Sequence, residues 1–240
     1  MNEDNIIYYI IALALAPVVI LLFYIYHKDR YAPEPISQLL KAFFFGVLSA
    51  PLSFLLSEPF AALGLYPNIP VTIGGSISTA FWGAAIPEES MKLIMLWLLL
   101  RKNKYFDEKM DGIVYAVFVS LGFAAIENLI YLFSNYDMFI KIGIMRGIFS
   151  IPGHFCFGIL MGYYYSLAKF YPKSSAKNRI LILVAPIIVH GIYDSVLMVM
   201  DIAPYLSSIC SIIFLVLCHK MWKYGKLRIE EHLLRDKESN

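Results

Sequence analysis

The stretch GIVYAVFVSLGFAAIENLIYLF (residues 112–133) is 22 residues long, and Glu127 is its only charged residue. An α-helix of about 20 apolar residues is long enough to cross the hydrocarbon core of a bilayer. We therefore expect a transmembrane helix that carries a carboxylate inside the membrane. Six further apolar runs have a suitable length: 6–26, 39–57, 73–100, 142–168, 180–198 and 204–222. The sequence predicts an all-α, polytopic transmembrane bundle of about seven spans.

The composition agrees with this architecture. Apolar residues make up 59% of the 240 residues and charged residues only 16%, whereas soluble domains carry about 25% charged residues. The formal net charge is +2, so nothing favours a nucleic-acid partner. The three cysteines lie in apolar runs without a C-x-x-C pair, which predicts neither a disulfide framework nor a thiolate zinc site.

The distribution of lysine and arginine predicts the orientation. Cytoplasmic loops of membrane proteins are enriched in these residues. They are frequent in segments 27–38, 101–111 and 169–179 and after residue 223, whereas segments 58–72, 134–141 and 199–203 contain only Lys141. We therefore expect the N-terminus outside and the C-terminus in the cytoplasm. Residues 1–225 would form a single transmembrane domain, followed by a short charged cytoplasmic tail over residues 226–240.

Ionisable residues occur inside four consecutive spans. A charge at the centre of a bilayer costs at least about 2.5–3.5 kcal/mol, so such residues persist where they are paired or functional. We therefore predict one shared polar site between these spans. Its members are Glu88, Glu89 and Lys92 in the third span, Glu127 and Asn128 in the fourth, Arg146 and His154 in the fifth, and His190 and Asp194 in the sixth.

Spacing and depth support a shared site. Glu88 and Lys92 are four residues apart, as are His190 and Asp194, so each pair lies on one helix face. At 1.5 Å per residue, Glu127 and His190 lie about 10 Å below the predicted outer boundary, and Glu88, Glu89 and His154 lie about 20 Å below it. Pro87, Pro152-Gly153 and Gly191 adjoin these residues. Irregular backbone within a membrane is tolerated where it lines a water-containing cavity.

These residue types allow two hydrolytic mechanisms. The sequence has no G-x-S-x-G motif, and Cys156 is two residues from His154 and faces another direction. In one mechanism a glutamate activates water and a histidine stabilises the oxyanion without a metal. In the other, Glu127, His154 and His190 hold a zinc ion and Glu88 or Glu89 is the base. A proton- or ion-coupled transporter, and an inactive protein that binds a membrane partner, remain alternatives.

Ordered motifs in the chain resemble the PrsW-type intramembrane proteases. They are Glu88-Glu89-x-x-Lys92, Phe123-x-x-x-Glu127-Asn128 and His190-x-x-x-Asp194, together with the segments 146–154 and HKDRYAPEP (27–35). The resemblance implies a bacterial plasma-membrane endopeptidase that makes the first cut in a membrane-anchored anti-sigma factor, on the extracytoplasmic side, in a stress response. By position, it implies that the essential residues are Glu88, Glu89, Glu127, His154, His190 and Asp194.

The family is also similar to the superfamily that contains the CAAX prenyl endopeptidases. The pattern of that superfamily more often has E-E-x-x-x-R and F-x-x-x-H. This chain instead has Lys92 at the shorter spacing and Glu127 in place of the histidine. These differences favour the PrsW type. An endopeptidase for prenylated peptides stays as an alternative.

Overall fold

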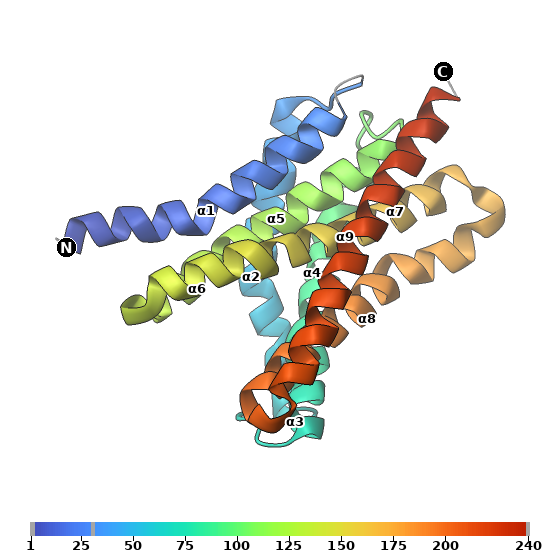
Figure 1. Cartoon of the computed structure of the whole chain (residues 1–240). Coiled ribbons are helices and arrows are strands. Elements are labelled where there is room, and N and C mark those ends of the chain that lie inside the picture. The colour runs from blue at the N-terminus through green and yellow to red at the C-terminus, as the bar shows by residue number, and fades with distance from the viewer. Residues whose placement is uncertain (1–2, 30–31, 239–240) are drawn as a thin grey trace.

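The computed structural model describes residues 3–29 and 32–238 as an all-helical bundle (Figure 1). Arg30 and Tyr31 of the 27–35 segment, and the first two and last two residues of the chain, lie outside this description. The main α-helices are α1 (Glu3–Lys28), α2 (Ile36–Ala62), α4 (Ile86–Leu100), α5 (Lys109–Ser134), α7 (Ile151–Phe170), α8 (Ser175–Ile202) and α9 (Ser207–Lys237). The predicted all-α transmembrane architecture is confirmed.

Two of the predicted spans are interrupted helical runs. The third consists of α3 (Ile73–Ser78), the π-helix η1 (Thr79–Ala85) and α4. The fifth consists of α6 (Phe139–Met145), the π-helix η3 (Arg146–Ser150) and α7. Short 3-10 turns lie in three connections: η2 (Tyr136–Met138), η4 (Pro172–Ser174) and η5 (Pro204–Leu206).

Six helical segments of the described chain are long and apolar enough to cross a membrane. They are Asn5–Lys28, Ile36–Ala62, Lys109–Ser134, Tyr136–Phe170, Ser175–Ile202 and Pro204–Lys237. The remaining predicted span, 73–100, contains a π-helix and three charged residues near its middle, so its crossing stays a prediction. Its helical run is nevertheless continuous from Ile73 to Leu100.

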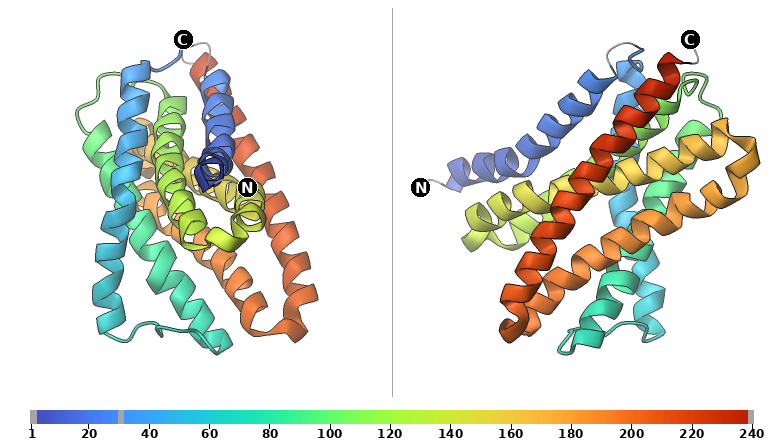
Figure 2. Two further views of the ribbon diagram at one scale, coloured as in Figure 1. Left: turned by 90° about the vertical axis from the view of Figure 1, so that its left-hand side faces the viewer. Right: turned by 45° about the vertical axis from the view of Figure 1, so that its right-hand side comes forward.

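Helix α5 forms the centre of the bundle, between α1, α2 and α7 (Figures 1 and 2). Most of its side chains are buried from Met110 to Ala125, which is why this run is apolar on every face. Helix α2 approaches it closely at Gly46 and Gly122. A Cβ atom on Gly46 would lie 1.9 Å from the Val119 carbonyl oxygen, and one on Gly122 would lie 2.1 Å from that of Phe43. Both positions therefore require glycine.

The connections alternate between the two ends of the bundle. The α1–α2 and α4–α5 connections lie at the same end as the C-terminus, and the α2–α3 and α8–α9 connections lie at the opposite end (Figures 1 and 2). Residues after 225, predicted as a charged tail, continue helix α9 to Lys237. In that segment Ile229, His232 and Asp236 are buried, and Asp236 accepts hydrogen bonds from the backbone N–H groups of Lys109 and Met110.

Candidate active site

Two π-helical turns position the polar residues of α4 and α7. Each turn is followed by a proline, Pro87 after η1 and Pro152 after η3. Proline has no backbone N–H group to donate within a helix, and a π-helical turn accommodates the changed hydrogen bonding. The irregular segments end at Ala85, three residues before Glu88, and at Ser150, four residues before His154. The helix-breaking residues in the sequence predicted irregular backbone in these regions.

Lys92 forms ion pairs with both carboxylates of α4. Its Nζ lies 2.8 Å from Glu89 Oε1 and 3.4 Å from Glu88 Oε2. It also lies 4.0 Å from the centroid of the Phe123 ring, within cation–π range. Glu89 and Lys92 are 0% and 1% exposed, whereas the Glu88 side chain is 13% exposed. Glu89 is thus an enclosed ion-pair partner, and Glu88 is the more accessible of the two carboxylates.

His190 of α8 lies between two carboxylates. Its Nδ1 is 2.9 Å from Glu89 Oε1, and its Nε2 is 3.2 Å from Asp194 Oδ2. The Phe157 ring stacks on the imidazole, with 4.4 Å between the centroids. Because both ring nitrogens face acceptors, the arrangement favours the imidazolium form, in which both nitrogens donate.

His154 of α7 joins Lys92 to Glu127 of α5. Its Nδ1 lies 3.2 Å from Lys92 Nζ, and its Nε2 lies 3.0 Å from Glu127 Oε2. An ammonium group only donates hydrogen bonds, so Nδ1 accepts and the Nε2–H donates to Glu127. This tautomer is inferred from the heavy-atom geometry.

Arg146, from the π-helix η3, holds Glu127 from the other side. Its Nη2 donates to Glu127 Oε2 at 2.7 Å, and its Nε donates to Asn128 Oδ1 at 2.7 Å. The guanidinium lies 3.9 Å from the centroid of the Tyr131 ring. Asn128 in turn donates to the carbonyl oxygen of Ala14 in α1 at 3.0 Å. One continuous network thus connects η3, α5, α7, α4 and α8.

This network borders a cavity of about 530 Å³. The polar lining includes Glu127, Arg146, His154, His190 and Asp194, and helix α9 supplies the facing wall with Ser211, Phe214 and Leu215. The size lies within the range of about 300–1,000 Å³ that is usual for ligand sites. A polypeptide segment therefore has room beside the two histidines.

The structure brings all eight predicted site residues together: Glu88, Glu89, Lys92, Glu127, Arg146, His154, His190 and Asp194. Sequence reasoning did not assign Tyr131, Tyr193 or Phe214 to the site. Tyr131 follows Glu127 by four residues and Tyr193 follows His190 by three, so helical spacing could have found both. Phe214 lies in an apolar run with no such signal.

Comparison with known proteins decides the family. A family model described as "PrsW family intramembrane metalloprotease" matches residues 34–219. The chain belongs to this family. Protease PrsW of Clostridioides difficile (strain 630) is 34% identical over 229 residues, which cover 94% of this chain and 92% of the relative. Protease PrsW of Bacillus subtilis (strain 168) is 35% identical over 189 residues, covering 78% and 82%.

Protease PrsW of Geobacillus kaustophilus (strain HTA426) is 36% identical over 190 residues, which cover 79% of this chain and 80% of the relative. No solved structure matches the chain significantly. The chain is thus an intramembrane peptidase of the PrsW family and a multi-pass bacterial membrane protein.

The metalloprotease description of the PrsW family agrees with the donor atoms at this site. Two sets of donor atoms among the described residues each converge within 4.8 Å: Glu88, Glu89 and His190, and Glu88, Glu127 and His154. Carboxylate oxygen and imidazole nitrogen are suitable zinc ligands. The predicted trio of Glu127, His154 and His190 takes members from both sets, and Glu88 is common to the two. Lys92 contacts both sets and already balances part of their negative charge.

Proposed function

We propose that this PrsW-family peptidase hydrolyses a peptide bond of a membrane-anchored protein in the middle-to-outer part of the bilayer. We further propose that the substrate is an anti-sigma factor or a similar regulator, and that this is its first cleavage. The observation that carries the proposal is the convergence of Glu127, His154, His190 and Asp194 on one cavity.

The position of the cavity supports cleavage in the outer half of the bilayer. It is lined by Leu197, Met198, Met200 and Asp201 near the end of α8 and by Ser211 near the start of α9. Ser211 is four residues from the start of α9, or about 6 Å along the helix axis. The distribution of lysine and arginine assigns this end of both helices to the extracytoplasmic side.

Glu88 is the residue we propose as general base. It is the α4 carboxylate with exposed surface, and it lies 3.9 Å from His190 Nε2. Its carboxylate would take a proton from a water molecule while the water oxygen attacks the peptide carbonyl, and would return the proton to the leaving amine. The cationic His190, whose two N–H groups are held by Glu89 and Asp194, would place positive charge beside the developing oxyanion. Arg146 would keep Glu127 and His154 in place.

As the alternative with a metal, we propose that Glu127 and His154, which border the cavity, would hold a zinc ion with a neutral His190 as the third ligand, and that Glu88 would remain the base. A bound zinc ion would polarise the scissile carbonyl and acidify a water molecule. Metal analysis of the purified protein, with cleavage assays before chelation, after chelation and after zinc addition, tests this part. Full cleavage by a metal-free, chelated protein would contradict it.

The experiment for the activity uses purified protein in liposomes with a membrane-anchored reporter, and mass spectrometry of the products. We expect the wild type to produce two fragments and Glu88→Gln to produce them about 10²–10⁴-fold more slowly. Glu58→Gln, on the exposed side of α2, makes the same chemical change away from the site and should cleave normally. Unchanged cleavage by a folded Glu88→Gln protein would refute the role of Glu88. Solute flux without cleavage would favour a transporter.

A further inference from the structure

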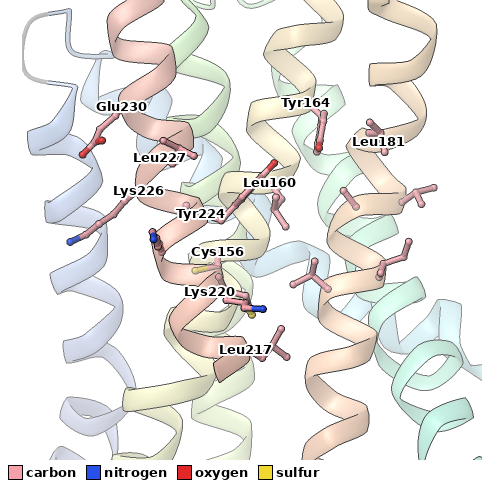
Figure 3. Close-up of a pocket in the computed structure, with 17 residues that line it drawn as sticks. Cys156, Leu160, Tyr164, Leu181, Leu217, Lys220, Tyr224, Lys226, Leu227 and Glu230 are labelled. Carbon is pink, nitrogen blue, oxygen red and sulfur yellow. The ribbon is translucent and has the colours of Figure 1, made fainter. Parts of the chain in front are cut away.

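A second cavity lies outside the active site, between α7, α8 and α9 (Figure 3). Its volume is about 930 Å³. Leu160, Leu181, Val184, Ile188 and Leu217 give it aliphatic walls. We call it the lateral groove. It differs from the active-site cavity because no histidine is among its described lining residues and its one acid, Glu230, points away from α7 and α8, so its shape and chemistry suit a hydrocarbon chain.

Basic and aromatic residues of α9 line the groove at one end. Leu217, Lys220, Tyr224 and Leu227 point from α9 toward α7 and α8, whereas Lys226 and Glu230 point away (Figure 3). The spacing of three and four residues explains why the first group shares one face. Lys223 also lines the groove. Lys220 and Lys223 are exposed, and no ion pair is found for either within the described part of the chain.

The level of these lysines matches the lipid headgroups. They lie at the end of the apolar run 204–222, which we predict to be the cytoplasmic boundary. Tyr164, Trp222 and Tyr224 lie near the same level, as expected for an aromatic belt. A lysine just inside this boundary can extend its ammonium group to the headgroup region.

A smaller cavity of about 290 Å³ extends the groove toward the active site. It shares Cys156 and Met221 with the groove, and Phe149 and Tyr193 with the active-site cavity. Tyr193 is 3% exposed, and its hydroxyl finds no hydrogen-bond partner among the described residues. Apolar cavity surface therefore borders both sides of Cys156 and Met221, from the groove to the Tyr193 ring.

We propose that the lateral groove binds one anionic phospholipid of the cytoplasmic leaflet. Its phosphate contacts Lys220 and Lys223, and an acyl chain lies along the aliphatic walls toward Cys156. Charge decides between this ligand and a substrate helix. The cytoplasmic flanks of transmembrane helices are rich in lysine and arginine, so Lys220 and Lys223 would repel them, whereas they attract a phosphate.

The fluorescence of Trp222, which lines the inner cavity, tests the proposal without any cleavage assay. Trp82 and Trp97 are replaced by phenylalanine, and the protein is placed in vesicles that contain brominated phosphatidylglycerol or brominated phosphatidylcholine. A lysine near an anionic lipid adds about fivefold in affinity. We therefore expect phosphatidylglycerol to reach half-maximal quenching at a mole fraction at least about tenfold lower than phosphatidylcholine does.

Lys220→Gln/Lys223→Gln should remove this difference between the lipids. The matched control Lys102→Gln/Lys104→Gln changes two exposed lysines in the α4–α5 connection and should keep the difference. Ala185→Phe fills the aliphatic wall, leaves both lysines in place, and should weaken quenching by either lipid. Equal quenching by both lipids in the protein that keeps Lys220 and Lys223 would overturn the proposal. So would a substrate-derived transmembrane peptide that relieves quenching equally in charged and uncharged vesicles.

Discussion

Lys92→Met removes the cation at the centre of the network while keeping an apolar side chain of similar length. In the wild type the ammonium lies 2.8 Å from Glu89 Oε1, 3.4 Å from Glu88 Oε2 and 3.2 Å from His154 Nδ1. Glu89 is 0% exposed, and its Oε2 already finds no partner among the described residues. The variant therefore leaves a buried carboxylate with only His190 to compensate it.

Breaking a buried ion pair by removing one partner costs about 3–5 kcal/mol, because the remaining charge stays buried. We expect Lys92→Met to lower the free energy of unfolding by an amount in this range and to abolish cleavage. Denaturant unfolding in detergent gives the first quantity, and product formation in liposomes gives the second. Lys92→Arg keeps the charge and should lose less stability.

A double-mutant cycle separates the charge effect from lost packing. In Lys92→Met/Glu89→Gln the uncompensated carboxylate is gone, so about 2–3 kcal/mol of the lost stability should return. Cleavage should stay absent, since the contacts that order His190 are missing. The reasoning is refuted if Lys92→Met unfolds like the wild type, or if the two substitutions are additive.

Three further predictions concern other parts of the molecule. Gly46→Ala places a Cβ atom 1.9 Å from the Val119 carbonyl oxygen, so α2 and α5 must separate, at a cost of about 1–3 kcal/mol in denaturant unfolding. Burial, followed by the nearby charge of Glu34, raises the pKa of Asp29 from its ordinary value of 3.8 to about 8. The folded protein therefore keeps a proton that the unfolded chain releases, and stability falls as pH rises through that interval. Asp29→Asn should flatten this slope and raise the melting temperature at pH 8 more than at pH 5; an unchanged slope would contradict it. Arg146 donates one hydrogen bond to Glu127 and one to Asn128, each worth about 1.5–3 kcal/mol, and Arg146→Lys should lose one of them. Cleavage should therefore slow by tenfold or more in the liposome assay, and a wild-type rate would contradict this.

The sequence was informative about the helices and about the members of the site. Uninterrupted apolar length marked the spans, because a bilayer requires it. Buried charges such as Glu89 and Lys92 stood out against that background because each is costly unless it is paired. The four-residue spacing of His190 and Asp194 alone places both on one helix face.

Contacts between helices could not be derived from the sequence. The bond of His154 to both Lys92 and Glu127 depends on how α4, α5 and α7 cross, and no local pattern encodes that crossing. The same limit applies to α9. Its Phe214 lines the cavity, but it lies in an apolar run in which no sequence feature distinguishes it. The π-helical turns were foreseen only as irregularities beside Pro87 and Pro152, since proline position does not specify the turn type.

We propose that carboxylates and imidazoles from separate helices act as one hydrolytic unit. Cleavage rates of Glu88→Gln, His190→Gln and the double variant, measured in liposomes at equal folded protein, test it most directly. Residues that act as a unit give non-additive losses, so the double variant should cleave no more slowly than the slower single variant. Independent losses that multiply in the double variant, or a wild-type rate in either single variant, would contradict the claim.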